Sequence, residues 1–279
     1  MKYDPVKKQL GNAFNKSPFL RKFFYGLLDV LLLRTWHIKR AIKHHFSDRR
    51  KESLQVLDAG MGFGQYSYYL SRKFRRWSIK GVDVKEEQVA DCNSFFAKIK
   101  LKNASFAAAD LTRLDEKEKY DFILSVDVME HIEDDNQVLT NFYQAMRTGG
   151  MLLISTPSDQ GGSDVHHHDD EDEHSFVDEH VRNGYNINAI QVQLKKAGFS
   201  TTKALYTYGT PGKISWKLSM KFPILMLNVS KLFFILLPVY YLVFFPLCLI
   251  LNVLDVHCSH RTGTGLVVKA WKNISNQKH

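Results

Sequence analysis

Three alternating glycines after a short apolar run are the residues best suited to chemistry. Residues 56–66 read VLDAGMGFGQY, with Asp58 shortly before Gly60, Gly62 and Gly64. Such glycines let the backbone approach a ligand closely and adopt conformations closed to other residues. The dinucleotide fingerprint G-x-G-x-x-G and the P-loop lysine are both missing. The loop and its carboxylate therefore suit a cationic, amine-bearing ligand better than a pyrophosphate.

Two further acids end the apolar runs that follow. Asp83 closes the next run, where a carboxylate can accept hydrogen bonds from both hydroxyls of a ribose. Asp110 closes the third run, where an adenine amino group could bind. Each acid alone could be a helix cap, because strand ends often carry Asp. The glycine loop and the acids, in this order, form a much more specific pattern.

These residues need a parallel sheet to bring them together. From Leu54 onward, short apolar runs alternate with amphipathic helical stretches, which is typical of a parallel sheet with helices on both faces. The predicted strands are 55–58, 78–84, 104–108, 122–126, 151–155, 202–208 and 266–272. The predicted helices between them are 66–74, 86–101, 134–146 and 187–197.

With these motifs the chain resembles the class I S-adenosylmethionine-dependent methyltransferases, and is similar to the ubiquinone-biosynthesis O-methyltransferases. The likeness covers about residues 52–208 and 262–273, and includes YDFILSVDVMEHI at 120–132 and RTGGMLLISTP at 147–157. It implies a Rossmann-like α/β fold with a seven-stranded sheet and helices on both faces. The last strand is expected to be antiparallel and to form a hairpin with the sixth.

The resemblance also implies S-adenosyl-L-methionine as cofactor and gives roles to individual residues. Asp58 and the three glycines would hold the methionine part, and Asp83 the ribose. The remaining cofactor contacts it implies are Asp110 with Leu111 at the adenine, and the backbone of Ser125 and Val126 on the sulfonium side.

A histidine after the fourth strand is the candidate general base. His131 lies near the expected position of the methyl group, and a histidine followed by Ile is implicated in catalysis in the similar phosphoethanolamine methyltransferases. Alternatively, Glu130 and His131 only open the following helix and fix the loop.

The string HVRNGY at 180–185 resembles a segment that lies over the substrate pocket in related methyltransferases. It makes His180, Arg182 and Tyr185 candidates for a lid or for substrate contact. Just before it, residues 159–180 hold nine acids and five histidines. A divalent metal site is chemically possible there. Low-complexity charge runs are more often solvated loops, so we expect no metal.

The basic charge of the chain belongs to its N-terminal arm. The net charge is +9, but residues 1–51 carry +10 and residues 52–279 carry −1. Apolar residues recur at helical spacing over 19–46, flanked by Arg and Lys, including Arg21. This predicts a basic amphipathic helix that caps the core, lies on an anionic membrane, or does both.

A second unusual segment is the apolar insertion at 211–257, which interrupts a methyltransferase domain predicted over 52–273. Residues 232–254 contain no charge, and this stretch is long enough to cross a bilayer as a helix. Pro238 and Pro246 are expected to kink such a helix. Since the resemblance makes the flanking strands neighbours in one sheet, both ends of the insertion must lie on the same side of the bilayer. The insertion is therefore a re-entrant hairpin, an in-plane element, or a helical pair packed on the protein or in a dimer.

The side chains around the apolar run favour membrane contact. Lysines at 213, 217, 221 and 231 suit a headgroup layer, and Trp216, Tyr240 and Tyr241 are amphipathic in the same sense. We expect a cytoplasmic protein, peripheral or monotopic on the membrane, because Asp29 interrupts the apolar stretch 23–33 and no cleavage site follows it.

The predicted activity is methyl transfer to a hydrophobic or lipid-like small molecule at that membrane surface. One alternative is a membrane-attached scaffold that binds cofactor without turnover. Another is nucleic-acid methylation, but the Asn/Asp-Pro-Pro-aromatic motif is missing after the fourth strand, so we expect no nucleic-acid partner. The acceptor, the methylated atom and the oligomeric state stay open.

Overall fold

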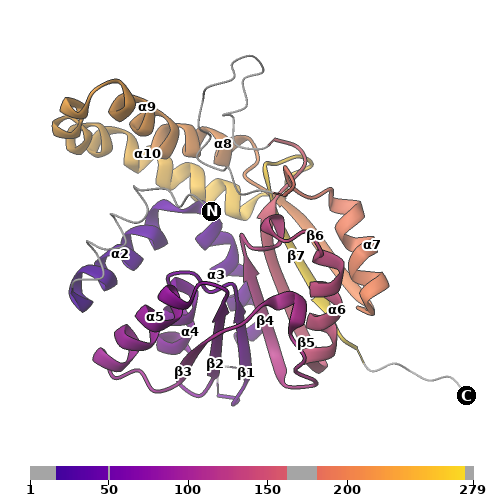
Figure 1. The fold of residues 1–279 in the computed structure, drawn as a ribbon. Coiled ribbons are helices and arrows are strands. Elements are labelled where there is room, and N and C mark those ends of the chain that lie inside the picture. The colour runs from indigo at the N-terminus through magenta and orange to yellow at the C-terminus, as the bar shows by residue number, and fades with distance from the viewer. Residues whose placement is uncertain (1–16, 50, 162–180, 274–279) are drawn as a thin grey trace, which may run out of the picture.

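A seven-stranded sheet forms the centre of the molecule (Figure 1). The computed structural model of the 279-residue chain describes residues 17–49, 51–161 and 181–273. The strand order is β3-β2-β1-β4-β5-β7-β6, and β7 runs antiparallel to both of its neighbours. The predicted sheet with an antiparallel last strand is confirmed. The strands are β1 (Gln55–Ala59), β2 (Ser78–Asp83), β3 (Ala104–Ala108), β4 (Tyr120–Val126), β5 (Met146–Pro157), β6 (Thr201–Thr207) and β7 (Gly265–Trp271).

Strand register brings the expected ligand-binding residues to one edge. Ala59, at the end of β1, pairs with Val82 of β2 on one side and with Ser125 of β4 on the other. The chain order reverses between β1 and β4, and ligands bind at such switch points outside the carboxyl ends of the strands. The glycine loop therefore begins at this point.

Helices cover both faces of the sheet, as predicted. On one face, α3 (Leu33–Phe46) and α4 (Gln65–Lys73) bury Ile42, Phe46 and Leu70 against β1 and β4. On the other, α6 (Asp135–Ala145) and α7 (Ile187–Ala197) bury Phe142 and Leu194. A further helix, α5 (Glu86–Lys98), packs beside β3.

The single helix predicted over 19–46 is wrong in one respect, because the structure has two helices there. α2 (Pro18–Leu31) and α3 are separated at Leu32, whose backbone is extended. α3 caps the sheet, whereas α2 turns away and docks through Arg21 and Tyr25, both buried. Arg21, predicted to flank the apolar stripe, is itself buried. The apolar spacing continues across the break, so periodicity alone could not locate it.

The insertion between β6 and β7 forms a helical hairpin that projects from the carboxyl edge of the sheet (Figure 1). Pro238 lies in the first turn of the long helix rather than at the expected kink, whereas Pro246 lies inside it. Helix α10 is long and apolar enough to cross a membrane by length and composition, and 11% of its most apolar window is buried. The hairpin comprises α8 (Thr210–Trp216), the π-helical stretch η3 (Lys217–Lys221), α9 (Phe222–Val229), η4 (Lys231–Ile235) and α10 (Leu237–His257).

Polar contacts hold the two arms of the hairpin together. The hydroxyls of Tyr240 and Tyr241 donate to the carbonyls of Leu218 and Ser219, at 2.7 and 2.8 Å. These two tyrosines, expected at a headgroup layer, therefore direct their hydroxyls toward the partner arm.

Buried Asp255 fixes the base of the hairpin to the domain. Its carboxylate lies 2.8 Å from Nε2 of His37 on α3 and 3.2 Å from Nε2 of His260. It also accepts hydrogen bonds from the backbone N–H groups of Tyr208 and Gly212. The base of the hairpin is thus joined to α3 and to the end of β6.

Candidate active site

At two positions of the glycine loop close packing leaves no room for a side chain, and at the third the backbone faces open space. Gly60, Gly62 and Gly64 all have positive φ, at 74°, 51° and 75°. A Cβ on Gly60 would lie 2.3 Å from Cγ2 of Val128, and one on Gly64 would lie 2.9 Å from Sγ of Cys92. A Cβ on Gly62 would meet nothing within 4 Å. The space in front of Gly62 can therefore accept a ligand against the backbone.

Asp83 connects the glycine loop to the turn after β2. One carboxylate oxygen accepts from the N–H of Gly62 at 3.0 Å, and the other accepts from the N–H of Lys85 at 3.0 Å. An ionised carboxylate has about four acceptor positions, so two remain for the hydroxyls of a bound ribose. The position and remaining capacity of Asp83 fit the predicted role.

Asp58 is a buried carboxylate beneath the loop. Its side chain accepts a hydrogen bond of 2.6 Å from Oγ of Ser67 in α4. Burial raises the pKa of this carboxyl to about 6, although the Ser67 hydrogen bonds oppose the rise. A cation bound nearby would favour the ionised form, so this environment fits a sulfonium or ammonium group.

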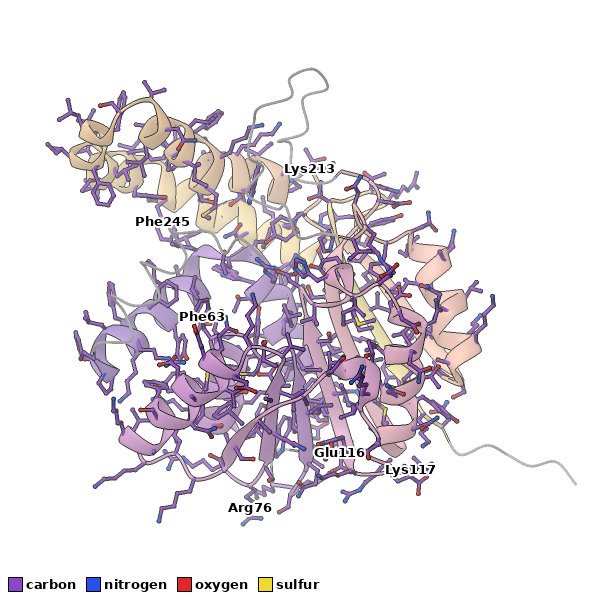
Figure 2. All side chains as sticks on the ribbon, viewed as in Figure 1. Phe63, Arg76, Glu116, Lys117, Lys213 and Phe245 are labelled. Atoms are coloured by element: carbon purple, nitrogen blue, oxygen red, sulfur yellow. The ribbon has the colours of Figure 1, made fainter. Side chains whose placement is uncertain are left out.

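Helix α2 clamps the same loop from outside, which the sequence did not predict. The guanidinium of Arg21 donates to the carbonyl of Phe63 at 2.8 Å and to Oδ2 of Asp91 at 2.5 Å. Tyr25 also donates its hydroxyl hydrogen to the carbonyl of Phe63. Phe63, labelled in Figure 2, is thus held by two side chains about 40 residues earlier in the chain.

Asp110 follows β3 at the predicted edge, but its side chain is engaged locally. Oδ1 accepts hydrogen bonds from the N–H and the hydroxyl of Thr112, at 2.9 and 2.8 Å, and so caps a short 3₁₀ turn. These hydrogen bonds lower the pKa of Asp110. Leu111 is buried beside it. Asp110 thus acts as the cap considered above, and its contact with adenine stays a prediction.

The end of β4 supplies the next part of the site. Ser125 is fully buried, and no hydrogen bond to its Oγ is found among the described residues. Val126 is half-buried. The following Asp127 has a positive φ of 50° and forms an ion pair with Arg34 of α3. Arg34 is a second contribution of the N-terminal arm that the sequence did not reveal, because nothing in its spacing points to Asp127.

Glu130 and His131 lie in the turn after β4, with opposite surroundings. Glu130 is fully buried, and its Oε2 accepts from the hydroxyl of Thr156 at 3.0 Å. Its Oε1 has no hydrogen-bond partner among the described residues, and burial raises the pKa of the carboxyl. His131 is exposed. The turn therefore offers an accessible imidazole beside a buried carboxyl.

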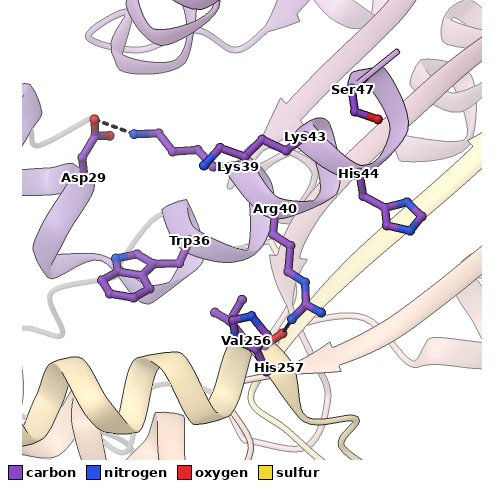
Figure 3. A pocket seen from close by; sticks show the side chains of 9 residues that line it. All are labelled: Asp29, Trp36, Lys39, Arg40, Lys43, His44, Ser47, Val256 and His257. Atoms are coloured by element: carbon purple, nitrogen blue, oxygen red, sulfur yellow. Dashed lines mark hydrogen bonds and ion pairs between the residues drawn. The ribbon is translucent and has the colours of Figure 1, made fainter. Parts of the chain in front are cut away.

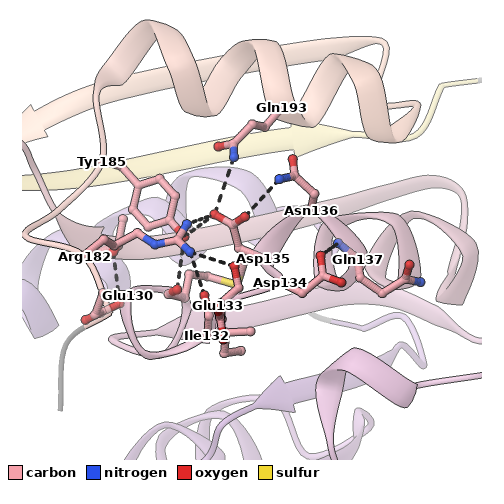
Figure 4. A network of polar contacts seen from close by, with 12 residues as sticks. Glu130, Ile132, Glu133, Asp134, Asp135, Asn136, Gln137, Arg182, Tyr185 and Gln193 are labelled. Atoms are coloured by element: carbon pink, nitrogen blue, oxygen red, sulfur yellow. Dashed lines mark hydrogen bonds and ion pairs between the residues drawn. The ribbon is translucent and has the colours of Figure 1, made fainter.

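Figure 4 shows Arg182 and Tyr185 meeting Asp135 at the start of α6. The Tyr185 hydroxyl lies 2.7 Å from Oδ2 of Asp135, and Arg182 forms an ion pair with the same carboxylate. Arg182 also donates to the carbonyls of Ile132 and Glu133. These side chains join the segment after β5 to the loop after β4, and they hold that loop in place. Substrate contact by either stays a prediction.

His180 and most of the acidic, histidine-rich stretch lie outside the described residues. Within the described part of the chain, no group of three or more His, Cys, Asp or Glu is arranged to hold a metal ion.

Comparison with known proteins agrees with this geometry. A family model described as "Methyltransferase domain" matches residues 50–208, which is more than half of the chain. The chain belongs to the methyltransferase domain family. The match ends at Tyr208, so α2, α3 and the helical hairpin lie outside it.

Individual relatives of this chain cover shorter stretches. It is 30% identical over 146 residues to malonyl-[acyl-carrier protein] O-methyltransferase of Bacillus cereus, covering 52% of this chain and 48% of that protein. It is 27% identical over 133 residues to ubiquinone biosynthesis O-methyltransferase of Rickettsia typhi, covering 47% and 52%. The chain thus spans about half the length of these curated relatives. The resemblance to ubiquinone-biosynthesis enzymes is confirmed at this level.

A solved structure extends the likeness of the fold. Phosphoethanolamine N-methyltransferase 2 of Haemonchus contortus, in complex with S-adenosyl-L-methionine, matches with a TM-score of 0.55 and 18% identity. The match covers 83% of this chain and 52% of that one. At this identity the likeness concerns the fold. The open space at Gly62, the acceptor capacity of Asp83 and the buried Asp58 together fit S-adenosyl-L-methionine.

Proposed function

We propose that this protein transfers a methyl group from S-adenosyl-L-methionine to a hydrophobic or lipid-like small molecule at a membrane surface. The observation that carries the proposal is the position of the apolar hairpin. It follows β6, and the glycine loop follows β1, so both leave the same carboxyl edge of the sheet. An acceptor dissolved in the bilayer would reach the site laterally.

The cofactor supplies a methyl group on a sulfonium, which is already a good leaving group. Asp58, Gly62 and Asp83 would bind it, and the chain would align the acceptor for in-line attack. For a hydroxyl acceptor a proton must also leave, and His131 is the proposed general base because it is an accessible imidazole at this edge. Glu130 beside it would orient the base or the acceptor.

The surface of the hairpin supports membrane attachment. Its tip is very exposed, with Leu232 and Ile235 each 75% accessible and Leu242 on α10 at 78%. Exposed apolar patches of this kind mark sites of interaction with membranes or proteins. Figure 2 shows mostly carbon side chains along the hairpin, with Lys213 at its base. A basic residue at that level suits an anionic headgroup layer.

Helix α2 adds a second apolar surface. Phe19 is 76% exposed and Phe23 is 59% exposed, although Arg21 and Tyr25 of the same helix are buried. α2 therefore docks on the glycine loop with one side and presents aromatic residues on another. We infer that α2 and the hairpin attach the protein to the cytoplasmic face of a membrane, as a peripheral or monotopic enzyme.

Mass spectrometry of a membrane lipid extract tests the chemistry. The full chain is incubated with vesicles of the extract and with cofactor that carries a deuterated methyl group. We expect a lipid-soluble product heavier by one labelled methyl, and no such product with Asp83→Ala. Cofactor binding without any labelled lipid would contradict the proposal and favour a scaffold. Labelled product only in the aqueous phase would contradict the lipid-like acceptor.

A further inference from the structure

A basic groove lies between α3 and the C-terminal end of α10 (Figure 3). Its volume is about 670 Å³. Figure 3 shows that α3 supplies most of its wall, while α10 closes it below. The groove is lined by Asp29, Trp36, Lys39, Arg40, Lys43, His44, Ser47, Val256 and His257.

Positive charge in the groove exceeds what its acid can neutralise. Asp29 is the one acid among the lining residues, and it pairs with Lys39 at 2.5 Å. Arg40 and Lys43 lie on α3 one turn apart, and both are exposed. Arg40 donates to the carbonyl of Val256 and so faces the end of α10. An anion between the two helices would neutralise these cations.

More positive charge lies behind the groove, on the sheet. Lys269 of β7 pairs in register with Lys203 of β6. Burial lowers the pKa of Lys269, and the positive charges of Lys203 and Arg40 lower it further. Positive charges thus gather around Arg40, and this favours the binding of an anion there.

The wall beyond the groove is apolar. On α10, Val253 and Ile250 precede His257 by one and two turns, and they are 45% and 59% exposed. The ring of His257 contacts the carbonyl of Val253 at 2.8 Å. The polar groove therefore begins where the apolar surface of the hairpin ends. A headgroup and its acyl chains have this same succession of polar and apolar parts.

We propose that this groove binds the phosphate of an anionic phospholipid, whose acyl chains lie along α10. The inference rests on the membrane attachment proposed above, and it adds a specific lipid at the base of the hairpin. Arg40 and Lys43 bind the phosphate, and Ser47 lies within the same wall as a hydroxyl donor. A free phosphate or a nucleotide would use the cations and leave the apolar wall of α10 uncovered.

Vesicle co-sedimentation of the full chain tests the site. Neutral phosphatidylcholine vesicles are compared with vesicles that contain about 30 mol% phosphatidylglycerol. The test variant is Arg40→Gln with Lys43→Gln. The matched control is Lys195→Gln with Lys196→Gln, which removes two exposed charges from α7 on the other face of the sheet. Lys43→Gln alone leaves the contact between Arg40 and Val256 intact, and so separates charge loss from misfolding.

We expect wild type to bind the anionic vesicles more tightly than the neutral ones. The double variant should lose affinity for anionic vesicles by about 30-fold, and Lys43→Gln alone by about fivefold. The α7 control should lose less than about twofold, because its charges lie on the other face of the sheet from the groove, and salt screens exposed charges at long range. Binding to neutral vesicles should be equal in all variants.

Other outcomes overturn the inference, and one of them concerns the proposed function instead. Equal losses in the groove variant and the α7 control would mean diffuse attraction without a site. Unchanged binding by the double variant would also refute the site. If millimolar inorganic phosphate raises the melting temperature of wild type but not of the double variant, and phosphatidylglycerol does not increase vesicle binding, the groove binds free phosphate and not a lipid. If neither kind of vesicle binds wild type, the membrane attachment itself is wrong.

Discussion

Replacing Arg21 by methionine removes the charged clamp between α2 and the glycine loop while keeping much of the apolar length of the side chain. Arg21 is 2% exposed, and its guanidinium reaches Phe63, Asp91 and the hydroxyl of Tyr25, the last at 2.7 Å. It also lies 4.4 Å from the ring centre of Phe95. The substitution therefore removes the charged partner of Asp91 and one hydrogen-bond donor each from the carbonyl of Phe63 and the hydroxyl of Tyr25.

The expected cost follows from these contacts. Breaking a buried ion pair by removing one partner costs about 3–5 kcal/mol. Because the side chain of Asp91 keeps 28% of its accessible surface, water can replace part of the lost interaction, and we take about 3 kcal/mol. For a chain of this size each kcal/mol lowers the melting temperature by about 2–4 °C, so we expect a loss of about 6–12 °C.

Thermal unfolding followed by circular dichroism measures this loss, with Lys22→Met as the matched control. Lys22 is the next residue of α2 and is exposed. The control should melt close to wild type. Calorimetric titration should show weaker binding of S-adenosyl-L-methionine by Arg21→Met at a temperature where it is folded. Equal melting temperatures and cofactor affinities for both variants would refute the role of α2 as a clamp.

Three further predictions concern the site. Gly62→Ala should fold, with about 1–2 kcal/mol of backbone strain, and lose cofactor binding, whereas Gly60→Ala should be destabilised further by contact with Val128. Calorimetry measures the cofactor affinity and thermal melts measure the stability, and a Gly62→Ala variant less stable than Gly60→Ala would contradict this. Because the pKa of Asp58 is about 6, protonation of this carboxyl should lower cofactor affinity about tenfold per pH unit below pH 6, and affinity should stay level between pH 7 and 7.5. Calorimetric titrations that give the same affinity from pH 5 upward would contradict this. Burial raises the pKa of Glu130, so ionisation of this carboxyl lowers the stability of the folded protein above the pKa of the unfolded chain, about 4.3. In urea unfolding, Glu130→Gln should therefore be more stable than wild type at pH 8 and lose that advantage near pH 4. A variant less stable than wild type at pH 8 would refute this.

The sheet and the glycine loop were predictable because their signals are local. Each strand is a short apolar run, and the positive φ of Gly60, Gly62 and Gly64 agrees with the need for glycine there. The resemblance added the antiparallel β7, which no local pattern could have placed beside β6. Asp83 was found for the same reason, since it ends a strand next to β1.

The contributions of the N-terminal arm could not be predicted. Arg21 and Arg34 are among the basic residues that flank the predicted apolar stripe, but in the structure they bind Asp91 and Asp127. These partners are distant in sequence, and charge type alone does not select one acid from many. The break at Leu32 also has no Pro or Gly to mark it. Tertiary docking of α2 decides both features.

Methyl transfer by a hairpin variant tests directly whether the hairpin brings a membrane-dissolved acceptor to the cofactor edge. Leu242→Asp with Val243→Asp puts two charges on the exposed surface of α10, and Lys98→Asp on α5 is a control for an added surface charge. Wild type, variant and control are compared for cofactor affinity and for labelled methyl incorporated into vesicles of membrane lipid extract. We expect equal cofactor affinity in all three and loss of lipid methylation only in the hairpin variant. Full methylation by a hairpin variant that no longer sediments with the vesicles would contradict it.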